Sequence, residues 1–115
     1  MHSRTRSRVR RGEVWWVNFD PAIGEEIKKW RPAIVVSNDA ANRYLNRFQV
    51  VPLTSNTDRL YPSEARVRIG SRLSKAMADQ IATASRERFG SRVDRVSDED
   101  MRAVDNAIRV QLGLS

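Results

Sequence analysis

The stretch RPAIVVSNDAANRYLNRFQVVPLT, residues 31–54, decides the fold. It holds two short runs rich in apolar and β-branched residues, 32–36 and 48–53, and such runs predict strands. Between them, residues 39–46 are long enough for about two helical turns, with a serine and an asparagine just before them as candidate caps. The stretch therefore predicts two neighbouring strands joined by a short helical connection.

A further strand is expected ahead of this stretch. Residues 13–19 are rich in aromatic and β-branched residues and end at the turn pair Asp20-Pro21. Trp15 and Trp16 are successive on this strand, so one is expected in the core and the other under a loop or at a subunit contact. Residues 22–31 combine one glycine with several charges and no sustained periodicity, and therefore predict a loop.

More strands and one helix are expected after the central stretch. Residues 64–69 alternate between polar and apolar side chains, as a half-exposed strand does, and a further strand is expected at 76–84. The last segment predicts a helix that begins after Ser97 and ends before Gly113. The apolar face of this helix, expected in the core, consists of Met101, Val104, Ile108 and Leu112. Together these elements predict a mainly β, α+β fold built as a small, partly open barrel.

The composition excludes most familiar kinds of active site. A chain of 115 residues fits one domain, and without cysteine it has neither disulfides nor a thiolate nucleophile. Its single histidine, His2, lies near the N-terminus, and no cluster of histidine and cysteine provides metal ligands. No apolar stretch approaches the ~20 residues of a membrane span, and no secretory segment is recognisable. We therefore expect a soluble protein of the cytoplasm.

The positive charge is concentrated at one end of the chain. Residues 1–11 contain five arginines and no acid, and so contribute +5 to the net charge of +7, which leaves about +2 for the rest. Such an arm is normally disordered and often binds nucleic acid, although a merely solvated tail fits the pattern equally well. We expect a basic, disordered tail over residues 1–11, followed by a single domain over residues 12–115.

Strand order brings three polar residues to one edge of the expected sheet. Consecutive strands joined by short connections usually run antiparallel and lie side by side. The end of the first strand, the start of the second and the end of the third then share an edge, and these points are Asp20, Arg31 and Thr54. Sites built from loops on a rigid sheet have this arrangement. Taken alone, Arg31 fits a salt-bridged surface residue equally well, and Thr54 fits a turn cap.

Five fragments, in order, resemble the MazF/PemK family of toxins. They are VWWVNFDP at 14–21, GEE at 24–26, RPAIVVS at 31–37, VPLTS at 51–55 and DQ at 79–80. The resemblance covers about residues 12–114. It implies an SH3-like barrel, a homodimer, and the toxin of a type II toxin–antitoxin pair. It also implies an endoribonuclease that cuts single-stranded RNA at short sequences without a metal or other cofactor, leaving a 2′,3′-cyclic phosphate and a 5′-hydroxyl.

The resemblance also suggests which residues carry the chemistry. Arg31 matches the family's catalytic arginine, and its guanidinium can hold two phosphate oxygens and stabilise the charge that develops on phosphorus. Thr54 matches the other catalytic position, and Glu26 is a candidate base, although the neighbouring Glu25 leaves this match uncertain by one position. Residues expected to contact RNA are Asp20, Glu25, Lys28, Lys29, Trp30, Ser55, Asn56, Asp79 and Gln80.

For some of these predicted RNA contacts, a purely structural role fits the sequence equally well. Trp30 is either a core aromatic or, beside two lysines, a platform for a base or a partner peptide. Asp79 and Gln80 either orient the site and read a base edge or form structural hydrogen bonds.

The expected partners follow from the same resemblance. They are single-stranded RNA, a second copy of the chain, and a cognate antitoxin whose acidic, flexible segment folds onto the basic groove near Arg31. One alternative is a non-enzymatic toxin that poisons DNA gyrase, but the chain ends without the aromatic residue on which such toxins rely. Another is a nucleic-acid-binding module that acts through residues 1–11 alone.

Overall fold

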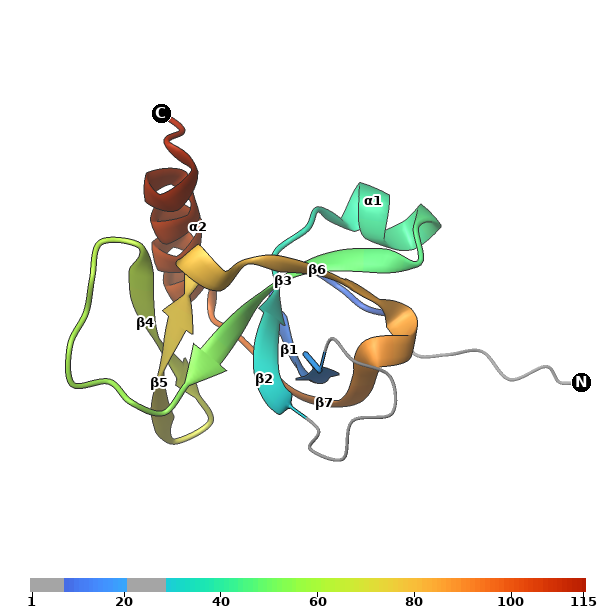
Figure 1. Cartoon of the computed structure of the whole chain (residues 1–115), viewed down its shortest axis with the longest axis horizontal. Helices are drawn as coiled ribbons and strands as arrows, with labels where there is room; N and C mark the ends of the chain where they lie inside the picture. The colour runs from blue at the N-terminus through green and yellow to red at the C-terminus, as the bar shows by residue number, and fades with distance from the viewer. Residues whose placement is uncertain (1–7, 21–28) are drawn as a thin grey trace, which may run out of the picture.

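The computed structural model describes residues 8–20 and 29–115. Within them, strands, helices and two short 3-10 turns follow one another along the chain (Figure 1). In chain order they are β1 (Glu13–Asn18), β2 (Trp30–Val35), α1 (Asp39–Tyr44), β3 (Arg47–Thr54), β4 (Glu64–Ile69), β5 (Arg72–Met77), η1 (Ala78–Gln80), β6 (Ala82–Ser85), η2 (Arg86–Arg88), β7 (Phe89–Arg95) and α2 (Asp98–Leu112).

The strands form one curled antiparallel sheet. Their order is β4-β5-β3-β2-β1-β7, and β6 pairs with β3 beside this path. The long strand β3 pairs with two further strands at different points along its length. Its first half pairs with β6, and its last two residues pair with β5. The sheet therefore bends at β3 but leaves β4 and β7 at separate ends. This arrangement confirms the expected mainly β fold with a partly open barrel and a C-terminal helix.

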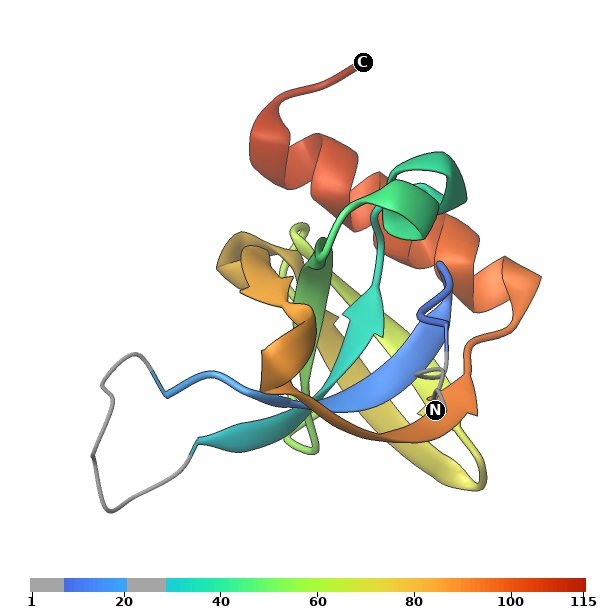
Figure 2. The same cartoon turned by 90° about the vertical axis from the view of Figure 1, so that its right-hand side faces the viewer.

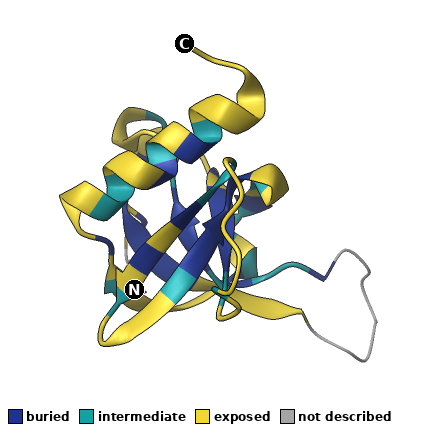
Figure 3. Cartoon of the chain, turned by 90° about the vertical axis from the view of Figure 1, so that its left-hand side faces the viewer, coloured by how far each residue is buried: buried dark blue, intermediate teal, exposed yellow. Residues whose placement is uncertain are grey.

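Both faces of the three central strands are buried. On one face Val14, Ile34 and Val51 join a cluster that α2 covers through Val104 and Ala107. The opposite face holds a second cluster, formed by Val9, Trp15, Val17, Ala33, Val35, Phe48, Val50, Ala84 and Phe89. Burial on both sides explains why the central strands are continuous apolar runs rather than alternating ones. Figure 3 shows dark blue segments of the sheet beneath α2, whose outer side is yellow.

The C-terminal helix lies across one side of the curled sheet (Figure 2). Its start is capped as expected, since Ser97 Oγ accepts a hydrogen bond from the Asp100 N–H at 3.1 Å. At its end Gly113 adopts φ +71°, the left-handed conformation that favours glycine. The expected apolar face was wrong at its last position: Leu112 is 53% exposed, and the fully buried helix residues are Val104 and Ala107.

Two further expectations need correction. The strand expected at 76–84 is interrupted, because β5 ends at Met77 and the η1 turn separates it from β6. Strand β7 was not predicted at all, since only its first residue is buried and its sequence lacks alternation. This strand belongs to the sheet because its backbone pairs with β1. No helix in the described part of the chain is long and apolar enough to cross a membrane.

The end of the basic arm is part of the fold. Residues 1–7 lie outside the described residues, but Val9 is buried in the second cluster. Arg11 donates its backbone N–H to Asp39 at 2.7 Å, and its guanidinium pairs with Asp105 of α2. The packed region therefore includes residues 8–11, which were expected to belong to a disordered tail.

Candidate active site at the edge of strands β2 and β3

A pocket of about 320 Å³ lies at the edge where β2 begins and β3 ends. The residues that line it come from β1, β2, β3 and β5 and from the start of the loop that follows β3. They are Trp16, Trp30, Arg31, Pro32, Leu53, Thr54, Ser55, Arg72 and Ser74.

Strand register explains why Arg31 and Thr54 meet in this pocket. Strand β2 runs antiparallel to β1 and to β3, with Val17 opposite Arg31 and Ala33 opposite Pro52. Continuing the second register by two residues brings Arg31 level with Thr54. The shared edge predicted from strand order is therefore present, and it holds the two residues in one pocket.

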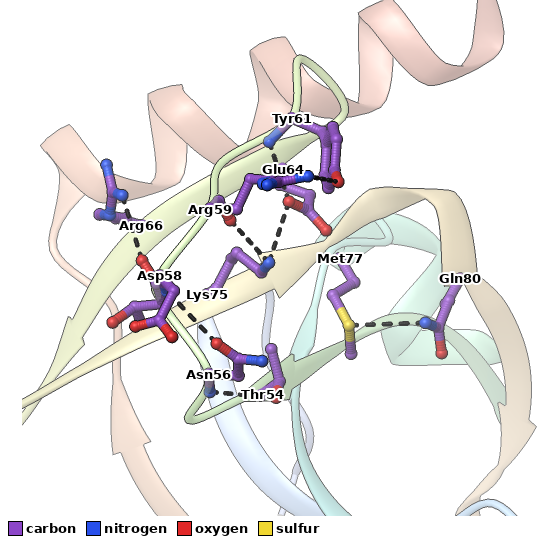
Figure 4. A network of polar contacts seen from close by, with 11 residues as sticks. Thr54, Asn56, Asp58, Arg59, Tyr61, Glu64, Arg66, Lys75, Met77 and Gln80 are labelled. Atoms are coloured by element: carbon purple, nitrogen blue, oxygen red, sulfur yellow. Dashed lines mark hydrogen bonds and ion pairs between the residues drawn. The ribbon is translucent and has the colours of Figure 1, made fainter.

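The two polar groups have different surroundings. Arg31 is exposed, so its guanidinium can reach an anion that enters from solvent. Thr54 is half-buried, and its Oγ1 accepts a hydrogen bond from the Asn56 N–H at 3.2 Å, drawn in Figure 4. A hydroxyl that accepts one hydrogen bond can still donate its own proton. Thr54 is thus both the turn cap and a donor that faces the pocket.

Two tryptophans form an aromatic wall beside Arg31. Trp15 and Trp16 alternate as predicted, with Trp15 3% and Trp16 40% exposed, and Trp30 is 43% exposed. Both half-exposed rings line the pocket. Gly90 of β7 makes room for them, because a Cβ there would lie 3.2 Å from Trp30 Cζ3 and 3.5 Å from the Cβ of Trp16. An unpaired base can stack on such a surface.

Sequence reasoning missed three polar or aromatic residues of this lining, Trp16, Arg72 and Ser74. Trp16 was not expected to contact a base, although strand alternation already placed it opposite the buried Trp15. Arg72 and Ser74 were missed because β5 reaches the edge by pairing with the end of β3, where Leu53 lies opposite Ala76. The strand expected in this region began only at residue 76, so no sequence pattern pointed to them.

Several residues predicted to contact RNA lie outside the lining of this pocket or outside the described residues. Glu25, Glu26 and Lys28 lie outside the described residues. Asp20 follows β1 and is buried outside the described lining of the pocket. Four exposed residues also lie outside this lining, namely Lys29, Asn56, Asp79 and Gln80. Asn56 is nevertheless linked to the pocket, because its backbone N–H donates a hydrogen bond to Thr54 Oγ1. Gln80 donates to Met77 Sδ at 3.5 Å, a structural contact.

The charge of the pocket favours an anion. Its described lining contains the cations Arg31 and Arg72 and no carboxylate. A larger hollow of about 620 Å³ lies between the β4–β5 hairpin and the start of α2. Its charged residues are of both signs, three arginines and three acids, namely Arg66, Arg68, Asp94, Arg95, Glu99 and Asp100. The smaller pocket, with cations, a hydroxyl and an aromatic wall, is therefore the one suited to a phosphate joined to a base.

The described residues of this pocket offer neither a metal site nor an evident base. Among the residues that the structure describes, no group of three histidine, cysteine, aspartate or glutamate side chains could hold a metal ion. At the start of α1, outside the lining of this pocket, the hydrogen bond from the Arg11 N–H lowers the pKa of Asp39. The described part of the pocket therefore provides charge stabilisation and proton donation but no evident proton acceptor.

Comparisons with known proteins show what this chain is similar to. The family model described as "PemK-like, MazF-like toxin of type II toxin-antitoxin system" matches residues 10–112. Endoribonuclease MazF9 of Mycobacterium tuberculosis H37Rv is 39% identical over 115 residues, covering 92% of this chain and 98% of that protein. Endoribonuclease EndoA of Bacillus subtilis 168 is 30% identical over 111 residues, covering 92% and 96%.

A solved structure extends the comparison to three dimensions. An endoribonuclease in complex with its cognate antitoxin, from a mycobacterial species, has a TM-score of 0.79 and 25% identity to this chain. The match covers 93% of this chain and 97% of that one. The similarity in sequence and in fold therefore runs through almost the whole of each protein.

Proposed function

This chain belongs to the family of PemK-like, MazF-like toxins of type II toxin–antitoxin systems, and we propose that it cuts single-stranded RNA at the pocket that contains Arg31 and Thr54. It is an endoribonuclease, like its relatives from Mycobacterium tuberculosis and Bacillus subtilis. The observation that supports this site is the convergence of a guanidinium, a hydroxyl and two half-exposed indole rings in one pocket that has no carboxylate in its described lining.

The substrate brings its own nucleophile to this pocket. The ribose 2′-oxygen attacks the adjacent phosphorus, the bond to the 5′-oxygen of the next nucleotide breaks, and a 2′,3′-cyclic phosphate and a 5′-hydroxyl result. The step needs a proton acceptor, a proton donor and stabilisation of the charge that builds up on the phosphate oxygens. Neither a thiolate nor an imidazole of the protein is required for the attack itself.

We assign these tasks to the residues as follows. Arg31 binds two oxygens of the scissile phosphate and stabilises the transition state, since its planar fork matches that geometry. Thr54 donates its hydroxyl to the same phosphate, with Ser55 as a neighbouring donor. The positive charge that a metal provides in other nucleases comes here from Arg31 and Arg72. Glu26 is the proposed proton acceptor for the 2′-hydroxyl, with Glu25 as the alternative, and water supplies the proton that the departing 5′-oxygen takes up.

A cleavage assay in EDTA tests this proposal. We expect a long single-stranded RNA to be cut at a limited set of sites, with fragments that end in 2′,3′-cyclic phosphate and begin with 5′-hydroxyl. Arg31→Ala should abolish most of the cutting, whereas Arg43→Ala, at an exposed position on α1, is the matched control and should cut normally. RNA that stays intact with the wild-type protein, or activity that requires added metal, would contradict the proposal.

The partners follow from the family. We propose that the protein acts as a homodimer and is neutralised by a cognate antitoxin. The similar mycobacterial endoribonuclease is in complex with its cognate antitoxin. We propose that the antitoxin covers the pocket with an acidic, flexible segment, because the described lining carries cations only. We also propose that the protein works in the cytoplasm, where its RNA substrate lies, and that residues 8–115 form a single domain.

A further inference from the structure

A buried ion pair lies behind the loop that follows Thr54. Lys75 Nζ of β5 is 3.1 Å from Glu64 Oε1 of β4, and the two side chains are only 9% and 10% exposed. Removing two charges from water is costly, and an apolar pair of similar size often stabilises a fold as well or better. The proposed cleavage step does not use either residue. The pair therefore calls for a role other than packing.

The ion pair holds the backbone of the loop formed by residues 55–63. Lys75 Nζ also donates to the carbonyl oxygen of Arg59 at 2.8 Å. Glu64 Oε1 accepts from the Tyr61 N–H at 3.0 Å, and the Glu64 N–H donates to the Tyr61 carbonyl at 2.9 Å. Figure 4 shows the two charged side chains reaching up to this loop from the adjacent strands. Both charged side chains therefore bind the backbone of the loop as well as each other.

The large side chains of this loop do not belong to either core cluster. Its large side chains Leu60 and Tyr61 are 42% and 50% exposed. Further described attachments are polar too. Arg66 donates to the Thr57 carbonyl at 3.1 Å, the Asp58 N–H donates to Asn56 Oδ1 at 3.3 Å, and the Ala78 N–H donates to the Ser63 carbonyl at 3.0 Å. The conformation of the loop therefore depends on hydrogen bonds and on the buried pair.

The same loop begins at the candidate active site. Ser55 lines the pocket, and the Asn56 N–H binds the Thr54 hydroxyl. Lys75 lies directly opposite Thr54 in the pairing of β3 with β5. A shift of the loop at Arg59 or Tyr61 would therefore be transmitted to the residues beside the proposed scissile phosphate.

We propose that Lys75 and Glu64 are positioning residues that hold the 55–63 loop in the conformation that reads RNA next to the cut, so that the pair sets affinity and cut-site choice. This inference rests on the proposed function, because it concerns substrate selection at that site. Neither residue touches the reacting atoms, and each acts through the backbone of the loop.

The test compares Lys75→Met and Lys75→Arg with the wild-type protein. Methionine keeps an unbranched apolar stem, one atom shorter than lysine, but removes the charge, whereas arginine restores a donor and a charge. For Lys75→Met we expect the KM for a short RNA with one preferred site to rise about tenfold, as for the loss of one charge-assisted hydrogen bond, while kcat stays close to that of the wild type. On a long RNA the cut sites should become less selective. Lys75→Arg should recover part of both properties.

Two controls separate loop position from stability. Val104→Ala removes buried volume from α2 on the far side of the sheet and should lower thermal stability while KM and cut sites stay unchanged. If Lys75→Met does not fold, Glu64→Gln provides the same test, because glutamine keeps an acceptor for the Tyr61 N–H but loses the charge. Wild-type KM and cut sites in a folded Lys75→Met or Glu64→Gln protein would overturn the inference. Failure of the wild-type protein to cut RNA would instead overturn the proposed function.

Discussion

Arg31 opens strand β2, where it is exposed beside Thr54 and in the same pocket as a second arginine. Its guanidinium can form two parallel hydrogen bonds to one phosphate, which a lysine cannot do. We expect Arg31→Ala to lower the cleavage rate by about 10²–10³-fold, the usual cost of losing a donor aimed at developing charge, and Arg31→Lys to lose less. Single-turnover rates measure the effect, and circular dichroism checks the fold.

Thr54 provides a companion test in the same pocket. Thr54→Ala should slow cleavage less than Arg31→Ala, because it removes a neutral donor, while Thr54→Ser keeps the hydroxyl and should retain most of the rate. Equal losses in the alanine and serine variants would show that the γ-methyl group matters and the hydroxyl does not.

Arg72 was not foreseen and carries its own prediction. It lines the pocket from β5, one strand away from β3, and can contact a phosphate next to the scissile one. Arg72→Ala should raise the KM and reduce the salt dependence of RNA binding by about 0.7 in log–log slope, the value for one phosphate on a single strand. The measurement is a salt titration with RNA that carries a 2′-deoxy group at the cut site. An unchanged slope would place Arg72 outside the RNA path.

At the scale of elements, strand β7 supports the aromatic wall through Gly90. A Cβ at this position would lie 3.2 Å from Trp30 Cζ3, closer than ordinary contacts allow. We expect Gly90→Val to push the Trp30 ring aside and weaken binding of the 2′-deoxy RNA by about tenfold, within the range for one stacked base. Stability should not fall, because valine suits a strand better than glycine.

The indole N–H signals in an NMR spectrum provide the readout for this change. The signal of Trp30 should shift, whereas that of Trp15, which donates to Glu13 Oε1 at 3.0 Å in the core, should not. Ser91→Val, at the exposed neighbouring position, is the matched control and should leave RNA binding unchanged. Normal binding by Gly90→Val would rule out stacking on Trp30.

Helix α1 has a titratable contact at its first residue. The backbone N–H of Arg11 lowers the pKa of Asp39 below its ordinary value of 3.8. A carboxyl whose pKa is lower in the folded state contributes stability above its unfolded pKa, and this contribution is lost as the pH falls through the folded pKa. Asp39→Asn keeps the acceptor without the charge, so it should lower stability at pH 7 and converge with the wild type in acid. Urea unfolding across this pH range measures the difference.

The predictability of each element reflects how locally it is determined. Strands β1, β2 and β3 were predictable because burial on both faces makes them continuous apolar runs, and the caps of α2 follow from Ser97 and Gly113. For the same reason Arg31 and Thr54 could be brought to one edge from strand order alone. Strand β7 and Arg72 could not, because their places depend on pairings between strands distant in sequence, β7 with β1 and β5 with β3.

For the whole molecule, the N-terminal arm provides a test of where the domain begins. Val9 is 3% exposed in the second core cluster, and Arg11 joins α1 to α2. Deleting residues 1–11 should therefore cost about 2–4 kcal/mol, mostly from the lost valine burial, whereas deleting residues 1–7 leaves these contacts in place. Urea unfolding distinguishes the two. If both truncated proteins were equally stable, Val9 would not belong to the folding unit.

The pairing of β1 with β7 also governs when the protein can become active during its own synthesis. Strand β1 lies in the sheet between β2 and β7, but 70 residues separate the end of β1 at Asn18 from the start of β7 at Phe89. At about 5–20 residues per second, the ribosome needs roughly 4–14 s to supply the missing neighbour. Until then one edge of β1 has no partner and Gly90 is not yet beneath Trp30. A growing chain that already contains Arg31 and Thr54 therefore still lacks the finished pocket, and the timing of translation delays its activity.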